Sequence, residues 1–419
     1  MKAFGFFVGI LFMGNFAFAQ QLAPLTESNS PLLTQIFSKS SQAFFDVLSQ
    51  PDKYRYQVIY TKINRDKNGL PTLEHHYYNY SRRQYFYPAS LVKLPLSVLA
   101  LHKTDSLAVN GISAYTPMLT GVADACQTAA LFDFTQKNGY PSVDGYVKKM
   151  MLVSDNDAYN RIYEYLGYDY INEKLHKYQL PDVRIVQRFA QQCDSLSYYC
   201  TNPICFLNGA DTIFKQSACT AQTRLVYPYG EAFMGNGFYD FTNYFHPYPR
   251  SFIYNNFLCL QDLQTVLEGI YFPETFDSKY NIELSTNSRK LLQKYMGQYP
   301  RESSFPSYNL NDNYKKYFMI GDGTLPPSDA NLRIFNVVGK AYGVLSDCAY
   351  VADFDNNVEF MLTAVLYVNE DEILNDDKYE YDTIGHPFLA ELGNLIYNFE
   401  RTRNRNFTID FTDKKVLFD

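Results

Sequence analysis

Hydrophobic and polar positions follow two different rhythms along this chain, and the changes between them predict its elements. Residues 31–50 place Leu32, Ile36, Phe44 and Val47 at roughly helical spacing, which predicts a helix. The segments 54–63 and 72–81 instead alternate like strands and are joined by a turn-rich stretch, so they predict a hairpin. A second helix is expected to begin near Ser90.

The same reading extends to the end of the chain. Residues 145–178 contain two helical stretches that break around 154–157, and residues 258–272 and 285–300 return to helical spacing. Residues 334–368 hold three apolar, β-branched runs with turns around Ser346 and around 355–357, which predicts an antiparallel meander. A closing helix is expected over residues 384–400.

This order of elements predicts a mixed α+β (or α/β) architecture, with an antiparallel sheet flanked by N- and C-terminal helices beside a mostly helical lobe. We expect one domain over residues 20–419. Its sheet lobe would comprise about 31–88 and 332–400, and its helical lobe about 89–331. Binding sites in two-lobed folds usually lie in the seam between the lobes.

Residues 190–260 differ in composition, being rich in Tyr, Phe, Asn, Gly and Pro, and they predict long irregular loops. Their aromatic side chains could line a binding groove, but packing of this insertion against the body is favoured. The cysteines are Cys126, Cys193, Cys200, Cys205, Cys219, Cys259 and Cys348. The four between 193 and 219 predict local disulfide bonds, whereas a zinc site is disfavoured because the usual ligand spacing is missing.

The N-terminal residues have the pattern of a targeting signal. Lys2, an apolar run and an ending in "AFA" at Ala19 predict a signal peptide over residues 1–19, and therefore a periplasmic or secreted protein. No later segment is apolar enough to span a membrane. The formal net charge of −7 argues against nucleic-acid binding, which depends on positively charged surfaces.

Candidate chemistry begins with Ser90 and Lys93, which are spaced as Ser-x-x-Lys at the mouth of an apolar helix. Positions three apart share a helix face, so the two side chains can meet. One interpretation is a helix cap with a surface cation. The other is a nucleophile with its base, because a buried lysine can lose its proton and activate a neighbouring serine.

Two further stretches change the balance between these interpretations. Ser154, Asp155 and Asn156 stand between two helical stretches, where turn residues are also common. Lys340 follows a β run and precedes Gly343. Each feature alone is compatible with ordinary turn or strand-end chemistry.

Together the three stretches resemble the motif set of the penicillin-interacting serine enzymes, Ser-x-x-Lys, Ser-Asp-Asn and Lys-Thr-Gly. "PASLVKLPL" is similar to the nucleophile helix of class A β-lactamase-like serine hydrolases, "VSDNDAYNRIYEYLG" to the Ser-Asp-Asn loop with its following helix, and "GKAYG" to the third motif. The resemblance covers 31–399 in outline and is close only at these motifs. It implies the β-lactamase/transpeptidase-like fold.

The resemblance also implies roles for individual residues. Ser90 would be the acylated nucleophile, and Lys93 would act as its base or position the base. Ser154 would relay a proton to the leaving nitrogen, and Asn156 would hold the substrate's amide side chain. Lys340 would attract a substrate carboxylate and help to keep Lys93 neutral.

The third motif and the loop after Ser-Asp-Asn both depart from the family pattern. Ala341 stands where the family has a threonine, and the extra Tyr342 leaves open whether Tyr342 or Gly343 joins Ser90 in the oxyanion hole. The stretch near 183–202 has no Glu to activate a deacylating water, and Asp182 and Asp194 have no spacing to recommend them. An acyl-serine should therefore form but hydrolyse slowly.

We therefore predict an exported serine hydrolase that acts through Ser90 on a small-molecule or peptide substrate, such as a β-lactam or a peptidoglycan-type peptide. The alternatives are a D-Ala-D-Ala peptidase or esterase of the same fold, and a non-catalytic exported binding protein. No His-Glu-x-x-His motif and no glycine-rich phosphate loop occurs, so we expect neither a metal nor a cofactor. A monomer is expected.

Overall fold

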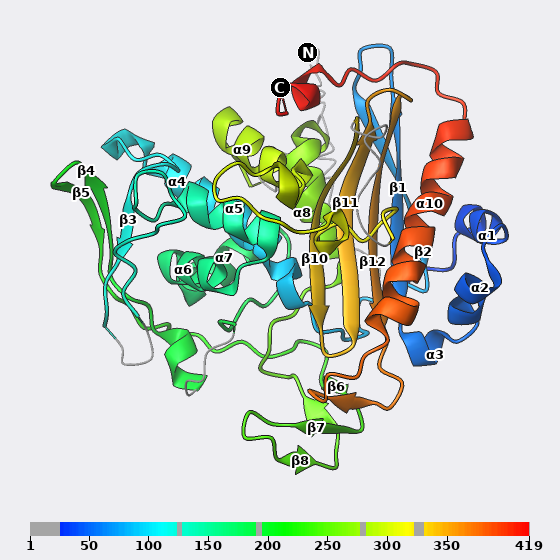
Figure 1. Cartoon of the computed structure of the whole chain (residues 1–419), viewed down its shortest axis with the longest axis horizontal. Helices are drawn as coiled ribbons and strands as arrows, with labels where there is room; N and C mark the ends of the chain where they lie inside the picture. The colour runs from blue at the N-terminus through cyan, green and yellow to red at the C-terminus, as the bar shows by residue number, and fades with distance from the viewer. Residues whose placement is uncertain (1–25, 124–127, 190–194, 277–281, 322–330, 419) are drawn as a thin grey trace, which may run out of the picture.

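The computed structural model describes residues 26–123, 128–189, 195–276, 282–321 and 331–418. Its centre is a five-stranded antiparallel sheet in the order β10-β11-β12-β1-β2 (Figure 1). The strands are β1 (Gln57–Arg65), β2 (Pro71–Tyr78), β10 (Leu332–Ala341), β11 (Val344–Asp353) and β12 (Val358–Tyr367). The N-terminal hairpin joins the C-terminal meander because β1 pairs with β12, with Gln57 opposite Val365. The two predicted strand groups therefore form one sheet.

Helices from both ends of the chain cover one face of this sheet (Figure 1). They are α1 (Pro31–Phe37), α2 (Gln42–Leu48), α3 (Pro51–Tyr54) and α10 (His386–Thr402). The single helix expected over 31–50 is split, because Ser41 caps α2 by accepting a hydrogen bond from the Phe44 N–H at 3.2 Å. Phe44 stacks on Phe388 of α10 at 4.4 Å, so the two ends of the chain share one apolar core.

The helical lobe packs beside the other face of the sheet. Its helices are α4 (Lys93–Ser106), α5 (Val143–Val153), α6 (Asn156–Leu166), α7 (Tyr168–Lys177), α8 (Leu260–Tyr271) and α9 (Thr286–Gly297). Helix α4 is buried along most of its length, as its nearly continuous apolar sequence requires. The expected fold class, an antiparallel sheet with flanking terminal helices and a mostly helical lobe, is confirmed.

The insertion at 190–260 is more ordered than expected, because short strands run through it. They are β4 (Ile204–Asn208), β5 (Asp211–Gln216), β6 (Phe233–Met234), β7 (Gly237–Tyr239), β8 (Phe245–His246) and β9 (Arg250–Ser251). Strand β4 also pairs with β3 (Met118–Thr120), and β7 pairs with β13 (Ile373–Leu374). Figure 1 shows the β4–β5 hairpin and the β6–β8 region at the periphery of the molecule.

The first turn of the C-terminal meander lies earlier than predicted. Strand β10 ends at Ala341 and β11 starts at Val344, so the turn consists of Tyr342 and Gly343, and Ser346 lies within β11. Both turn residues have positive φ, 53° and 78°, as a tight two-residue hairpin turn requires. The apolar run concealed this turn because tyrosine is an unusual residue for it.

Two expectations concern segments that the structure describes only in part. The signal peptide, Cys126, Cys193 and Asp194 lie outside the described residues. Within the described ranges, Cys205, Cys219, Cys259 and Cys348 form no disulfide bond. Across those same ranges, no helix is both long and apolar enough to cross a membrane.

Candidate active site

Ser90 lies in a short 3-10 turn, η1 (Ala89–Val92), directly before α4. Ala89 has a φ of 45°, which costs a non-glycine residue conformational energy and is typical of residues beside functional groups. The Leu91 N–H donates to the Pro88 carbonyl at 3.0 Å and closes the turn. Ser90 is thereby held half-buried at the start of a rigid, buried helix.

Lys93 is fully buried, which excludes the interpretation of a surface cation. Its Nζ lies 2.9 Å from Ser90 Oγ, 3.0 Å from Ser154 Oγ, and 2.8 Å from Asn156 Oδ1. It also donates to the Ser154 carbonyl at 2.5 Å. The structure therefore places Ser90, Ser154 and Asn156 around the Lys93 amino group, so four of the predicted site residues lie together.

The environment of Lys93 favours its neutral form. Burial lowers the pKa of Lys93 well below its ordinary value, and the positive charge of Lys315 lowers this pKa further, while Asp155 raises it. A neutral lysine amine can accept a proton, so Lys93 is suited to act as the base for Ser90.

The Ser-Asp-Asn stretch forms the junction between α5 and α6. Ser154 has a φ of 56° and a ψ of 37°, a left-handed conformation that ends α5. Asp155 then caps α6 by accepting the Ala158 N–H at 2.7 Å. This sharp junction turns both the Ser154 hydroxyl and the Asn156 carboxamide toward Lys93, which explains why three short polar residues occur here.

The third motif approaches Ser90 along the open edge of the sheet. At Gly339 an added Cβ would lie 2.8 Å from the Pro88 carbonyl oxygen, so only glycine allows β10 to pack this closely against η1. Lys340 is exposed, and its Nζ lies 4.4 Å from the centre of the Tyr381 ring. Ser90 and Lys340 both line two neighbouring clefts.

Part of the chain matches the model of a known family. Residues 43–218 match the model of the beta-lactamase enzyme family. The match includes Ser90, Lys93, Ser154 and Asn156 and ends before Lys340. It confirms the resemblance to class A β-lactamase-like serine hydrolases.

Solved structures of this family resemble the chain at low sequence identity. The β-lactamase from Sphaerobacter thermophilus is 12% identical and covers 85% of this chain and 96% of its own, with a TM-score of 0.47. The chromosome-encoded β-lactamase of Vibrio parahaemolyticus is 14% identical over 86% and 100%, also with a TM-score of 0.47. A PBP-A mutant, solved as an acyl-enzyme with penicillin G, is 16% identical over 87% and 97%, with a TM-score of 0.46. The comparison with curated proteins returned no match.

The two clefts that meet at Ser90 differ in character. One, of about 490 Å³, is lined by polar groups that include Ser154, Asn311, Lys315 and His386. The other, of about 580 Å³, has an aromatic lining made by Tyr87, Phe189, Tyr342, Tyr379 and Tyr381. Among the described residues lining either cleft, none comes from 190–260, which supports the packing interpretation of that insertion.

The insertion instead supports the site from behind. Arg250 Nη1 donates to the Tyr342 hydroxyl at 3.1 Å, and the Arg250 guanidinium lies 4.9 Å from the centre of the Tyr342 ring. The Tyr342 ring also packs edge-on against Phe252. These contacts hold a non-glycine residue in the positive-φ conformation of the hairpin turn.

The Gly343 N–H is already engaged, because it donates to the Tyr381 hydroxyl at 2.9 Å. Tyr381 opens a π-helical turn, η9 (Tyr381–Gly385), of a kind found frequently at functional sites. Of the two backbone donors left open by the sequence, the Tyr342 N–H is therefore the better candidate for an oxyanion hole with the Ser90 N–H.

The loop after α7 presents an apolar ring to Lys93. Asn160 accepts the Phe189 N–H and donates to the Phe189 carbonyl, both at 2.9 Å, and so holds this part of the loop by its backbone. The Phe189 ring centre lies 5.5 Å from Lys93 Nζ. Asp182 is no substitute for a glutamate here, because it accepts hydrogen bonds from Arg82 and Tyr229.

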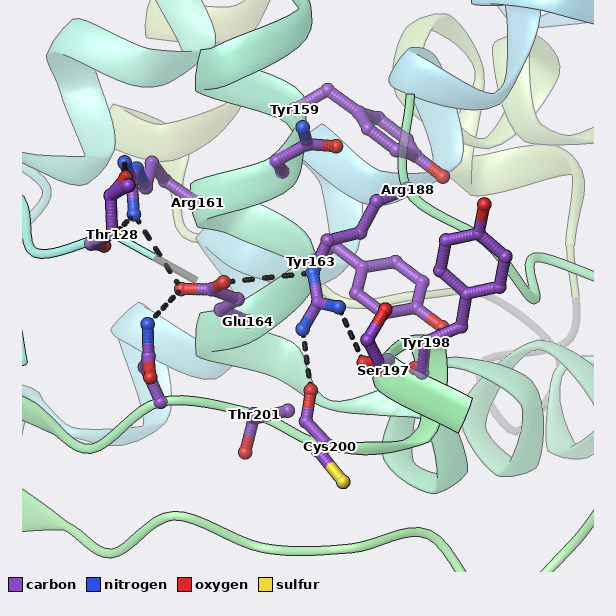
Figure 2. Close-up of polar contacts among 12 residues, drawn as sticks. Thr128, Tyr159, Arg161, Tyr163, Glu164, Arg188, Ser197, Tyr198, Cys200 and Thr201 are labelled. Atoms are coloured by element: carbon purple, nitrogen blue, oxygen red, sulfur yellow. Dashed lines mark hydrogen bonds and ion pairs between the residues drawn. The ribbon is translucent and has the colours of Figure 1, made fainter. Parts of the chain in front are cut away.

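A buried network fixes the same loop from its other side. Figure 2 shows the Arg188 guanidinium between Glu164 of α6 and the carbonyl oxygens of Ser197 and Cys200. The Arg188 bonds to these two carbonyls are 2.6 and 2.5 Å long. Arg161 lies on the opposite side of Glu164, at 3.8 Å. Glu164 is therefore paired with two arginines, and this network stabilises the loop.

Three residues of the site were missed by the sequence analysis. Lys315 has no motif around it. Phe189 could have been found only as the residue paired with Asn160 across the fold, and Tyr381 only through its contact with the hairpin turn. The short motifs around Ser90 and Ser154 were the part of the site that could be predicted from the sequence.

Proposed function

We propose that this protein is a serine hydrolase that forms an acyl-enzyme on Ser90. The observation that carries the proposal is the contact between Ser90 Oγ and the buried, unusually acidic Lys93 amine at 2.9 Å. A non-catalytic binding protein would not need a desolvated lysine with its charge disfavoured beside a serine. The family resemblance supports β-lactamase-like chemistry on an amide.

The proposed reaction starts with attack of Ser90 Oγ on the carbonyl carbon while its proton passes to Lys93 Nζ. The N–H groups of Ser90 and Tyr342 stabilise the negative charge that develops on the carbonyl oxygen. The C–N bond then breaks, and the leaving nitrogen takes a proton through the Ser154 hydroxyl, which lies 3.0 Å from Lys93 Nζ. Asn156 would orient the acyl side chain.

Release of the acyl group is proposed to be the slow step. The position that the Asn160 carboxamide fixes beside Lys93 carries Phe189, whose ring cannot activate a water molecule. This favours a second candidate function, a D-Ala-D-Ala peptidase or esterase of the same fold, in which β-lactams form long-lived adducts.

The first test is covalent labelling of the purified full chain. A fluorescent penicillin and an uncharged fluorophosphonate are each incubated with the protein, and the adducts are located by intact-mass measurement and peptide mapping. We expect one adduct on Ser90. Rapid turnover of penicillin without an adduct would contradict slow release, and labelling by neither probe would contradict the hydrolase proposal.

A matched pair of serine variants controls this experiment. Ser90→Ala should abolish labelling. Ser97→Ala removes a buried hydroxyl of α4 that donates to the Lys93 carbonyl at 2.8 Å and lines neither of the two clefts at Ser90, so it should leave labelling intact. Equal labelling of both variants would place the nucleophile elsewhere.

We also propose that the protein is exported, with residues 1–19 as the cleaved signal. The basic start, apolar run and "AFA" ending support this proposal. Fractionation of producing cells, followed by N-terminal sequencing, should recover a chain beginning at Gln20. An intact N-terminus on cytoplasmic protein would contradict it.

A further inference from the structure

The polar cleft contains a second buried lysine for which the reaction above has no use. Lys315 follows η7 (Asp312–Tyr314), is 1% exposed, and lines the same cleft as Ser90 and Ser154. Among the described residues, its Nζ has no hydrogen-bond partner. An ammonium group buried without a partner is costly, so its presence calls for a reason.

The fold holds Lys315 in place through its backbone. Asn336 Nδ2 donates to the Lys315 carbonyl and to Asp347 Oδ1, both at 2.7 Å. Asp347 Oδ2 accepts the next backbone N–H groups, from Tyr317 at 3.0 Å and from Phe318 at 3.3 Å. The carboxylate of Asp347 is therefore engaged by amide groups, and the lysine side chain is left to the cleft.

The neighbouring lysine shows what a structural lysine looks like in the same place. Lys316 is equally buried, but its Nζ donates to the Met296 carbonyl and, at 2.8 Å, to Asn336 Oδ1. Two adjacent residues in one environment thus have opposite arrangements. Lys316 is satisfied within the core, whereas Lys315 lines the cleft and its Nζ has no hydrogen-bond partner among the described residues.

We propose that Lys315 is a positioning residue for acylation. Its buried charge lies in the cleft that is also lined by Ser90 and Ser154, the two hydroxyl groups in contact with Lys93, and holds Lys93 in its neutral, proton-accepting form. This inference rests on the proposed acylation of Ser90. It gives to a buried residue a role that the sequence resemblance had given to Lys340, whose side chain is exposed and stacked on Tyr381.

The charges around the pair agree with this role. Burial lowers the pKa of Lys315 to about 8, while Asp347 opposes this shift and favours the charged form of Lys315. Lys315 in turn lowers the pKa of Lys93, against Asp155. The other titratable groups among the described residues lining the polar cleft are Tyr314, Tyr317, Lys340, Asp382 and His386. The buried Lys316 is hydrogen-bonded away from the cleft, to Asn336.

The test compares the full-length wild-type protein with Lys315→Met, Lys315→Arg and Lys340→Met. The rate of Ser90 labelling by the uncharged fluorophosphonate is measured between about pH 5 and about pH 9, the range in which a shifted lysine titrates. Lys315→Met should raise the midpoint of the rising limb by about one pH unit, because a like charge next to Lys93 is gone. Lys315→Arg should restore the wild-type midpoint, and Lys340→Met should not move it.

Two outcomes would overturn the proposal. One is a wild-type midpoint in Lys315→Met, and the other is an equal displacement in Lys340→Met. Thermal unfolding monitors the fold, and Lys315→Met should melt at or above the wild-type temperature, because it removes an unpaired buried charge.

A direct titration of Lys93 separates this proposal from the proposed function. Isotope-labelled lysine side chains are followed by NMR, and the Lys93 signal is assigned by its loss in Lys93→Met. If Ser90 is never labelled but the Lys93 midpoint still rises in Lys315→Met, the hydrolase proposal fails and the electrostatic role of Lys315 stands. An unchanged Lys93 midpoint overturns the role of Lys315.

Discussion

Two groups of buried charges occupy the helical lobe and its seam, and they are built in opposite ways. In the network of Figure 2, Glu164 lies between Arg161 and Arg188, and Arg188 also donates to two carbonyl groups. In the seam at Ser90, Lys93 and Lys315 are both buried, and no carboxylate of the described residues is in contact with either.

The difference separates stability from reactivity. A buried charge with an opposite charge beside it is partly compensated and can fix the backbone around it. Two buried charges of the same sign raise each other's free energy, and the protein relieves this by releasing a proton from one of them. The first arrangement joins Arg188 to Ser197 and Cys200 across the loop, and the second is the one from which we propose that a base arises.

The largest expected effect is on the reactive side of this comparison. Lys93→Met should slow acylation of Ser90 by about 10³-fold, because a positioned general base typically contributes 10²–10⁴-fold. The free energy of unfolding should change by no more than about 1 kcal/mol, since the oxygen partners of Lys93 lie at a cleft open to water. The acylation rate is measured by fluorophosphonate labelling that is quenched at successive times, and the free energy of unfolding is measured in urea. A large loss of stability with retained acylation would reverse the assignment.

The paired network should respond in the opposite way. Arg188→Met leaves Glu164 with a weakened set of partners and breaks the bonds to Ser197 and Cys200, so we expect a loss of about 3–5 kcal/mol in the free energy of unfolding. Urea unfolding measures it. The exposed Arg401 is the matched control, and Arg401→Met should change stability by less than about 0.5 kcal/mol. Similar effects of the two variants would show that burial of the pair is unimportant.

Glu268 sharpens the comparison as a buried acid without a strong partner. Burial raises its pKa to about 8, its Oε1 has no hydrogen-bond partner among the described residues, and His75 Nδ1 lies 3.6 Å away. Because the folded state holds this proton more tightly than the unfolded state, its contribution to stability is complete below about pH 4.5 and is lost as the pH rises through about 8.

Glu268→Gln should therefore come within about 1 kcal/mol of the wild-type stability at about pH 5 and exceed it by about 4 kcal/mol at about pH 8.5. Thermal and urea unfolding at both pH values provide the measurement. His75, whose pKa is lowered to about 4 by burial, titrates in the opposite sense but is common to both proteins. If the variant were more stable than the wild type by the same amount at both pH values, ionisation of Glu268 would not be the cause.

The smallest expected effect concerns release of the acyl group. Phe189→Glu places a carboxylate on the loop position that Asn160 holds beside Lys93. We expect the acyl-enzyme to decay about tenfold faster, below the full contribution of an evolved base. The carboxylate should also raise the pKa of Lys93 and shift acylation to higher pH.

The control variant is Phe189→Gln, whose new side chain is nearly the same size as glutamate but carries no charge. It should keep the wild-type lifetime of the acyl-enzyme. Loss of covalent label after removal of free penicillin measures both variants. Equal lifetimes of the Glu and Gln variants would show that a missing carboxylate at this position does not limit release.

The sequence predicted those parts of the molecule that depend on local spacing. Ser90 and Lys93 are three residues apart on a helix, and Ser154 and Asn156 flank a helix junction, so their grouping followed from short motifs. The meander and the closing helix followed from the length and period of apolar runs. The two strand groups were expected to be able to share one sheet, but the pairing of β1 with β12 was not specified by the sequence.

Features set by tertiary contacts were not predictable. Lys315 and Lys316 are adjacent lysines in "NYKKYF", and only the positions of Asn336 and Asp347 decide which of them faces the cleft. The early turn at Tyr342 contradicts the usual residue choice for a tight hairpin and depends on Arg250 from a distant insertion. Neither contact leaves a pattern in the neighbouring sequence.

The most direct test of the account is the lifetime of the adduct between the protein and penicillin. The purified protein is exposed to benzylpenicillin, free penicillin is removed, and intact mass is followed over time with the modified peptide mapped. The account predicts one penicillin on Ser90 that persists far longer than the time needed to form it. Rapid turnover of penicillin without a lasting adduct would contradict it, and so would a folded protein that is labelled by neither penicillin nor fluorophosphonate.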